Sequence, residues 1–186
     1  MSRGRLVVIS APSGAGKTTI CRRLERDHPE WRFSVSGTTR PQRDHETNGK
    51  DYYFLTDDQF DEKVSKGEFL EWEWVHGYRY GTLHQALEEA LANGETLLLD
   101  VDVKGGVNIK QQFSGDTIAI FIDPPDMETL AARLKRRGTE DPAIIKQRLA
   151  RLPQELAYKQ DYDHVVVNDN LETAINEVEA ILKEVE

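Results

Sequence analysis

A glycine-rich segment near the start of the sequence has the residue types that bind a chain of phosphates. Residues 11–18 are Ala-Pro-Ser-Gly-Ala-Gly-Lys-Thr, between an apolar run and a helical pattern. Small residues let successive backbone N–H groups face a phosphate, and the N-terminus of the following helix adds partial positive charge. Lys17 can reach the β- and γ-phosphates of a nucleoside triphosphate, and the Thr18 hydroxyl can ligate Mg²⁺. We expect the triphosphate contacts to come from consecutive residues, namely Ser13, Gly14, Ala15, Gly16, Lys17, Thr18 and Thr19.

This phosphate loop indicates ATP or GTP as a ligand, but it leaves the reaction open. A GTPase switch would normally read its base with an Asn-Lys-x-Asp segment, and the sequence contains none. A chain of 186 residues is also short for a large ATPase motor. A small kinase remains, so the residues that bind the phosphate acceptor must lie elsewhere in the sequence.

Two arginines with short spacing could hold a phosphate monoester. Arg40 and Arg43 lie three positions apart, on either side of Pro41. Two guanidinium groups can bind one phosphate through paired charge-assisted hydrogen bonds. The phenolic hydroxyls of Tyr52 and Tyr80 could each donate a further hydrogen bond to it. Taken singly, either tyrosine could instead be an aromatic residue of the core.

The segment 70–74 has the alternating pattern of a strand with one buried face. Leu70, Trp72 and Trp74 alternate, and we expect their side chains to be buried. Glu71 would then point to the opposite face, as would Glu73. A carboxylate there offers two acceptors side by side, which match the N1–H and 2-amino donors of guanine. A glutamate between two tryptophans could equally lie on a solvated strand face.

Further polar residues could complete a guanine site and a metal site. The hydroxyls of Ser36 and Thr82 could donate to guanine O6. Asp100 ends an apolar strand and Asp102 follows it, at the edge of an α/β sheet where ligands bind. Asp100 could help position Mg²⁺ through water, together with the Thr18 hydroxyl. The alternative for one of these aspartates is to cap a helix N-terminus.

An arginine-rich segment follows in the second half of the chain. It contains Arg133, Arg136 and Arg137, then Gly138, and later Arg148. Phosphoryl transfer develops charge on the moving group, which arginines on a closing segment would stabilise while excluding water. The alternative is a solvated helix face.

Taken together, these segments resemble the guanylate kinase family, in its order and approximate spacing and over almost the whole chain. The segments that carry the resemblance are 11–18, 36–43, 46–54, 69–72, 80–82, 99–105, 133–138, 148–149 and 168–169. The chain departs from the family pattern at a few positions, which are Ala11, His45, Tyr78, Arg79 and Lys104.

The resemblance implies an enzyme that transfers phosphate from ATP to GMP, and usually also to dGMP, with Mg²⁺. It assigns the base contacts to Ser36, Glu71, Thr82 and Asp102, and the GMP phosphate contacts to Arg40, Arg43, Tyr52 and Tyr80. It also implies that Asn168 lies near adenine and that three arginines of the closing segment face the phosphates. The residues expected to be catalytic are Lys17, Arg40, Arg133, Arg137 and Arg148.

Two other interpretations of the sequence remain open. One is a different small-molecule kinase with a phosphate loop, although Ser36, Glu71 and Thr82 favour a guanine base over a sugar phosphate. The other is a guanylate kinase-like binding module that has lost catalysis and recognises a partner. Such modules typically have degraded phosphate loops and lids, whereas Lys17, Thr18 and the arginines of the closing segment are intact here.

The elements that must position these residues follow from the apolar patterns. Continuous apolar runs predict buried parallel strands at 6–9, 96–99, 118–122 and 165–167. Helical patterns separate them, at 16–27, 57–66, 83–92, 126–137, 141–158 and 171–184. We therefore expect an α/β fold with a parallel sheet flanked by helices. It would comprise a core (1–32, 93–125 and 156–186), an inserted GMP-binding subdomain (33–92) and an arginine-rich lid (126–155).

Composition narrows the setting of such an enzyme. The chain is 38% hydrophobic and 31% charged, as in an ordinary globular protein. Its net charge of −9 weighs against a nucleic acid polymer as a partner. No apolar run approaches the ~20 residues that span a bilayer. A single cysteine, Cys21, excludes an intrachain disulfide and is consistent with the cytoplasm. The sequence leaves open whether the protein is a monomer or a homo-oligomer.

Overall fold

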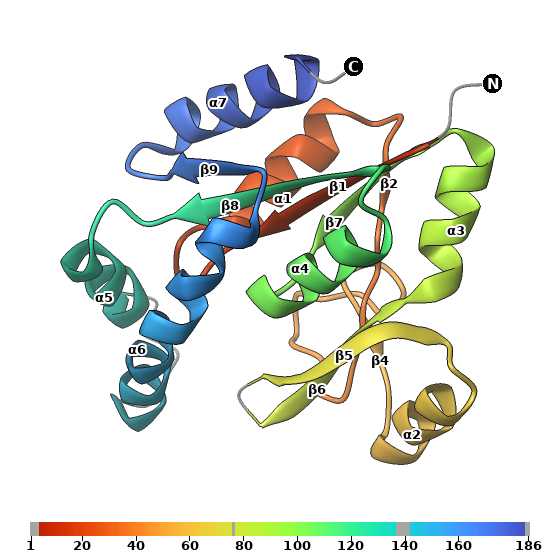
Figure 1. Ribbon diagram of the computed structural model, residues 1–186. Helices are drawn as coiled ribbons and strands as arrows, with labels where there is room; N and C mark the ends of the chain where they lie inside the picture. Colours follow the sequence, from red (N-terminus) through yellow and green to blue (C-terminus); the bar gives the residue numbers. More distant parts are fainter. Residues whose placement is uncertain (1–3, 76, 137–141, 185–186) are drawn as a thin grey trace.

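The core of the protein is a parallel sheet of five strands (Figure 1). The computed structural model describes residues 4–75, 77–136 and 142–184. The strands lie in the order β2-β7-β1-β8-β9, and every neighbouring pair is parallel. Their bounds are β1 Arg5–Ser10, β2 Arg32–Phe33, β7 Thr96–Asp100, β8 Thr117–Asp123 and β9 His164–Val167. The parallel sheet predicted from the apolar runs is confirmed.

Helices cover both faces of this sheet. The helices span α1 Lys17–Asp27, α2 Asp57–Ser65, α3 His84–Asn93, α4 Val103–Gln112, α5 Met127–Arg136, α6 Pro142–Ala157 and α7 Leu171–Glu184, and a 3₁₀ turn spans Tyr158–Asp161. Alternate residues of β1 enter two different cores. Val7 and Ile9 pack with α1 and α7, whereas Leu6 and Val8 pack with α3 and α4. Because both faces are buried, the inner strands are continuous apolar runs.

A second, smaller sheet lies below the core sheet in the view of Figure 1, next to α4. Its order is β4-β3-β6-β5, and its strands are β3 Gly37–Thr38, β4 Tyr53–Phe54, β5 Phe69–Val75 and β6 Tyr78–Leu83. Helix α2 packs on it through Phe60, whose ring stacks on Phe69 at 4.5 Å. A capping box begins this helix, since the Thr56 hydroxyl accepts from the backbone N–H of Gln59 at 3.2 Å.

Two burial predictions were wrong. Trp72 and Trp74 are 37% and 54% exposed, because α2 and the other described residues leave part of that face of the small sheet uncovered. Trp72 meets the edge of the Phe60 ring, and Trp74 lies under the guanidinium of Arg79. Val165 and Val167 are 40% and 47% exposed, because β9 is an edge strand of the core sheet.

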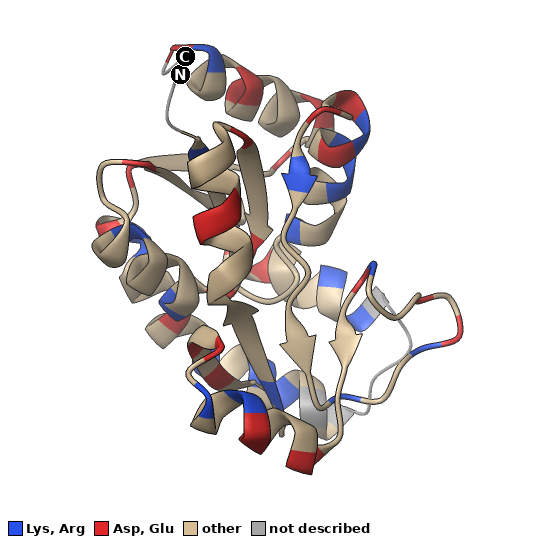
Figure 2. Cartoon of the chain, turned by 90° about the vertical axis from the view of Figure 1, so that its right-hand side faces the viewer, with Lys and Arg blue, Asp and Glu red and all other residues tan. Residues whose placement is uncertain are grey.

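Two surface properties complete the description. Figure 2 shows Lys and Arg interspersed with Asp and Glu over the helices, with no face of one sign in that view. Within the described ranges, every helix is too short or too polar to cross a membrane.

Candidate active site

The phosphate loop connects β1 to α1 through two glycines with left-handed backbone. Gly14 has φ +90° and Gly16 has φ +97°, a region that other residues rarely adopt. A Cβ at Gly16 would lie 2.3 Å from Nδ2 of Asn168. That amide donates to the carbonyl of Ala15 at 2.8 Å, and Asn168 is buried. Asn168, which was expected near adenine, therefore holds the backbone of the phosphate loop through a hydrogen bond.

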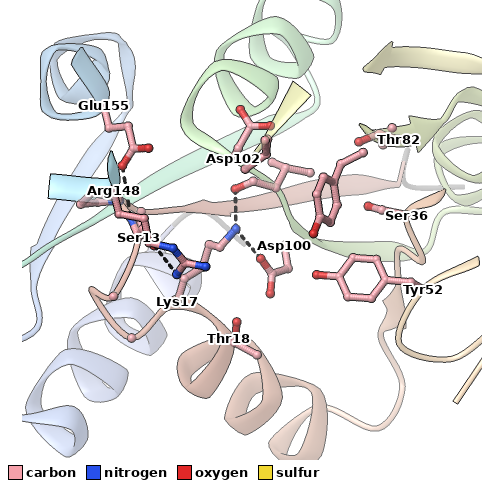
Figure 3. Close-up of a pocket in the computed structure, with 18 of the residues that line it drawn as sticks. Ser13, Lys17, Thr18, Ser36, Tyr52, Thr82, Asp100, Asp102, Arg148 and Glu155 are labelled. Atoms are coloured by element: carbon pink, nitrogen blue, oxygen red, sulfur yellow. Dashed lines mark hydrogen bonds and ion pairs between the residues drawn. The ribbon is translucent and has the colours of Figure 1, made fainter. Parts of the chain in front are cut away.

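Lys17, at the start of α1, is held by the end of β7. Its Nζ lies 2.6 Å from Oδ1 of Asp100 and donates to the carbonyl of Val101 at 2.9 Å. Burial by itself lowers the pKa of Lys17, but the charge and hydrogen bond of Asp100 outweigh it and raise the pKa above its ordinary value. The lysine is therefore a fixed cation, next to the carboxylate expected to act on the metal (Figure 3).

Helix α6 contacts the same loop through two side chains. The backbone N–H of Ser13 donates to Oε2 of Glu155 at 3.2 Å. The guanidinium of Arg148 donates to the Ser13 hydroxyl at 3.0 Å. Burial raises the pKa of Glu155, and the Ser13 hydrogen bond opposes this. Arg148 was expected in the site, whereas Glu155 was missed because nothing in its sequence surroundings marks it.

The expected base-binding residues line one cavity together with the phosphate loop. These residues are Ser36, Glu71, Thr82 and Asp102. Figure 3 shows Ser36 and Thr82 on the side opposite the loop, with Asp100 between the two sides. The Thr82 hydroxyl donates to Oε1 of Glu71 at 2.7 Å. A β-bulge between Phe69 and Glu71 shifts the register of β5 against β6, and bulges of this kind re-aim side chains next to active sites.

The other oxygen of Glu71 is available for a ligand. Oε2 is buried, and no described residue donates a hydrogen bond to it. Burial raises the pKa of Glu71 to about 7, the Thr82 hydrogen bond lowers it, and the charges of Asp102 and Glu73 raise it. A buried acceptor without a donor is costly, so this oxygen favours a ligand that brings N–H groups.

Asp102 has a structural role in addition to its place on the cavity wall. Its Oδ1 accepts from the backbone N–H groups of Lys104 and Gly105, both at 2.9 Å, and so caps α4. The capping alternative considered for the two aspartates is thus realised at Asp102. This contact fixes the side chain at the edge of the base cavity.

The four residues expected to bind the acceptor phosphate line a second cavity, which adjoins the first and shares Tyr52, Tyr80, Asp100 and Arg148 with it. These four residues are Arg40, Arg43, Tyr52 and Tyr80. Arg40 forms a two-pronged pair with Glu46, at 3.0 and 2.7 Å, and donates to the Tyr80 hydroxyl at 3.2 Å. Arg43 is exposed, and its backbone N–H also donates to Glu46. Burial raises the pKa of Tyr52 to about 12, so its hydroxyl remains a donor. Glu46 holds Arg40 in place, a role that the sequence reading did not assign.

Arg133, on α5, does not line either cavity. Arg133 donates to the carbonyls of Asn168 and Asp169, at 2.9 and 3.3 Å, and so contacts the end of β9. Arg137 lies outside the described residues. Of the three arginines expected to face the phosphates, the structure brings Arg148 to the cavities.

The residues expected to hold a metal ion offer oxygen donors suited to Mg²⁺. The Thr18 and Asp100 side chains line both cavities (Figure 3). Mg²⁺ usually takes one or two protein ligands and completes its octahedron with phosphate and water. In the described part of the chain, no group of three or more His, Cys, Asp or Glu could hold a metal ion without a substrate.

Comparison of the sequence and the fold with known proteins shows which family has this site. The family model described as guanylate kinase matches residues 3–185. The chain belongs to the guanylate kinase family. A guanylate kinase from Chlorobium chlorochromatii is 47% identical over 96% of this chain and 94% of its own length. A guanylate kinase from Thermotoga maritima is 43% identical over 97% of this chain and 87% of its own.

Solved structures agree with this membership. A guanylate kinase from Anaplasma phagocytophilum superposes with a TM-score of 0.82 and 31% identity, over 98% of this chain and 86% of its own. A shikimate kinase from Bacteroides thetaiotaomicron reaches a TM-score of 0.55 at 14% identity, over 96% of this chain and 98% of its own. That second likeness concerns the fold alone. The guanylate kinase family thus accounts for the whole described chain.

Proposed function

We propose that this chain transfers the γ-phosphoryl group of ATP to the phosphate of GMP, and of dGMP, giving GDP or dGDP. The observation that carries the acceptor is the buried Oε2 of Glu71, to which no described residue donates, in a cavity shared with the phosphate loop. None of the contacts assigned below involves the ribose 2′-hydroxyl, which is why dGMP is included.

Glu71 is the base reader in this proposal. Its carboxylate accepts from guanine N1–H and the 2-amino group, which gives the buried Oε2 a donor. Ser36, on the same side of the cavity as Thr82 (Figure 3), donates toward guanine O6. The Thr82 hydroxyl has one proton, so it donates either to Oε1 of Glu71 or to O6. Asp102, fixed by its capping bonds, adds an acceptor at the edge of the base.

The acceptor phosphate binds in the second cavity. Arg40 and Arg43 supply guanidinium donors, and Tyr52 and Tyr80 supply phenolic donors. Glu46 keeps Arg40 oriented before the substrate arrives, since the two-pronged pair leaves its guanidinium little freedom. The acceptor would therefore meet a site whose donors are already in place.

The donor side is the phosphate loop. Its backbone N–H groups from Ser13 to Thr19 and the Lys17 ammonium hold the β- and γ-phosphates. Arg148 faces the transferred group, and Arg133 and Arg137 join it from the lid. Thr18 and Asp100 would hold Mg²⁺, which when bound neutralises charge on the phosphates. Asn168 contributes to ATP binding indirectly, because it holds the phosphate loop through its bond to Ala15.

The reaction needs no strong general base. The phosphate oxygen of GMP is already anionic, so it forms the new bond to the γ-phosphorus as the bond to the bridging oxygen of ADP breaks. Lys17, Arg40 and Arg148 stabilise the charge that the transferred group carries between the two cavities. Alignment and charge stabilisation, rather than proton transfer, supply the rate.

The division into a core, a GMP-binding subdomain at 33–92 and a lid at 126–155 is part of the same proposal. It is supported by the separate small sheet and by the contact of α6 with the phosphate loop. The mixed surface charge supports the absence of a nucleic acid polymer as a partner. A cytoplasmic setting is supported by the free, buried Cys21.

The test is the base preference of the wild type and the Glu71→Gln variant. Kinetics of kcat/KM with GMP, IMP and AMP should rank them in that order, because IMP lacks the 2-amino donor and AMP presents a lone pair at N1. A site with buried polar groups left unpaired discriminates by roughly 10⁴–10⁵. Glu71→Gln offers one acceptor to two donors, so the GMP-to-IMP ratio should shrink while AMP stays poor.

Glu73→Gln is the matched control, since it lies on the same strand and pairs with Lys104 instead of lining the base cavity. It should keep the wild-type ranking. Phosphorylation of AMP at a rate similar to that of GMP by the wild type would refute the proposed acceptor. If the ratio of kcat/KM for GMP to that for IMP is the same in Glu71→Gln as in the wild type, Glu71 does not bind the base.

A further inference from the structure

The first turn of α4 lies directly behind the carboxyl group of Glu71. A Cβ built on Gly105 would lie 3.1 Å from the carboxyl carbon and from both carboxylate oxygens of Glu71. Contacts this short are rare for a real Cβ, so a side chain at 105 would move its neighbour by a few tenths of an ångström. The absence of a side chain at Gly105 is therefore what lets the carboxyl group sit where it does.

The backbone gives no other reason for glycine at this position. Gly105 is in the third position of α4 after its cap, with no left-handed φ. Glycine is among the least favourable residues for a helix interior, and alanine is the most favourable. Gly105 therefore destabilises its own helix relative to alanine and lies against the Glu71 carboxylate. This combination indicates that the glycine serves the site.

The neighbouring Gly106 shows the contrast. A Cβ there would lie 2.2 Å from the Tyr162 hydroxyl and 2.6 Å from the Ser10 hydroxyl. Both belong to the core behind α4, and Tyr162 donates from there to the carbonyl of Val103. Gly106 is thus required by packing, whereas Gly105 faces the carboxyl group of Glu71.

Glu71 has little room to adjust if it is pushed. Its Oε1 is held by Thr82 at 2.7 Å, and the charges of Asp102 and Glu73 lie near enough to raise its pKa. A push from α4 would therefore move the carboxyl group into the cavity or break the Thr82 bond. In either case the two carboxylate oxygens are no longer aligned with the two adjacent N–H donors of the base.

We propose that Gly105 is a positioning residue for base selection, because its missing side chain sets the depth at which the Glu71 carboxylate meets the purine. The inference rests on the proposed function and deepens it. Gly105 touches no substrate and acts only through Glu71. Its effect should accordingly appear in the recognition of the base and leave the donor side unchanged.

The experiment is steady-state kinetics of Gly105→Ala with GMP, IMP and ATP varied in turn. KM for GMP should rise on the order of tenfold, as expected for a misplaced binding group, while KM for ATP changes less than about twofold. The GMP-to-IMP ratio of kcat/KM should fall, because IMP has one donor fewer to lose. Gly115→Ala is the matched control, since a Cβ there meets nothing within 4 Å and should change neither value.

A double-mutant cycle shows whether Gly105 acts through Glu71. In a Glu71→Ala background the carboxyl group is gone, so adding Gly105→Ala should change KM for GMP less than about twofold. Thermal unfolding of all four proteins accompanies the kinetics. If Gly105→Ala alone fails to fold, the double variant should fold, because it lacks the contact.

The outcomes separate this inference from the proposed function. A wild type without preference for GMP over IMP and AMP counts against the proposed function. A wild type with that preference, and a Gly105→Ala variant with the same GMP-to-IMP ratio, overturns the inference alone. An equal loss in the presence and absence of Glu71, or a double variant as unfolded as the single one, also overturns it.

Discussion

Glu155 accepts a hydrogen bond from the backbone N–H of Ser13, so a carboxylate from α6 lies on the phosphate loop. The N–H groups of such a loop are the donors that bind a triphosphate. The protein without nucleotide thus satisfies one of them with its own anion. ATP must displace this carboxylate, or be bound by the remaining donors.

Replacing Glu155 by alanine should therefore tighten ATP binding. Without the competing carboxylate, and with one negative charge fewer beside the phosphates, the dissociation constant for ATP should fall several-fold, on the order of one charge-assisted hydrogen bond partly screened by solvent. Isothermal titration calorimetry measures this directly. Gln154→Ala, on the exposed side of the same turn, should change nothing. Weaker ATP binding by Glu155→Ala would mean that the carboxylate assists the nucleotide.

Replacing Lys17 by alanine should abolish most turnover and leave the fold intact. Its ammonium is fixed by Asp100 and Val101, so the charge is in place before the substrates arrive. Loss of such preorganised charge costs on the order of 10²–10³ in kcat. The measurement is kcat at saturating ATP and GMP, with cooperative urea unfolding as the check on folding. Turnover near that of the wild type would rule out the role of Lys17.

The activity toward GMP should fall as the pH is lowered through about 7, the pKa of Glu71. Protonated Glu71 presents an O–H to the guanine N1–H and so loses one acceptor. The pH profile of kcat/KM for GMP measures this. Glu71→Gln corrects for the phosphate of GMP, which titrates near ~6, and should lack the step at 7. An identical step in both proteins would assign it to another group.

The same shift has a consequence for stability with the opposite pH dependence. The native pKa of Glu71 lies above the ordinary 4.5, so the folded protein binds this proton more tightly than the unfolded chain. The contribution of Glu71 to stability therefore increases as pH falls from 7 toward 4.5. Urea unfolding of the wild type and Glu71→Gln at pH 5 and pH 8 should show this difference, and its absence would contradict a raised pKa.

Replacing Asn168 by alanine should damage the ATP side alone. The variant leaves the carbonyl of Ala15 buried without its donor, which costs about 1–3 kcal/mol of unfolding free energy. Loss of this support should raise KM for ATP and leave KM for GMP unchanged. Asp169→Ala, an exposed neighbour, should do neither. A rise in KM for GMP would show that Asn168 acts beyond the loop.

Most of the fold could be predicted from the sequence because its signals are local. Apolar runs gave the inner strands, and the predicted ends of α1 and α2 lie within one residue of those observed. Helix α4 was missed, because its first turn contains Gly105 and Gly106, which resemble a turn. The Cβ positions of those glycines lie against Glu71 and Tyr162, from distant parts of the chain. Tertiary contacts here override helix propensity.

The site could be predicted only as a set of residue types. The structure brings Lys17, Glu71 and Asp102 to one cavity, as the sequence reading expected. The sequence does not indicate that Lys17 pairs with Asp100 or that Glu155 contacts the phosphate loop, since each of these contacts joins residues far apart in the chain. The exposure of Trp74 was also unpredictable, because alternation shows that two faces differ and not which one is covered.

The bond between Asn168 and Ala15 joins two residues that lie 153 positions apart in the sequence. The first strand and the phosphate loop therefore leave the ribosome well before β9 does. A nascent chain that stops before β9 lacks the side chain that supports the loop. Ribosome-bound chains of increasing length should thus gain ATP affinity in one late step, when residue 168 has emerged from the ribosome.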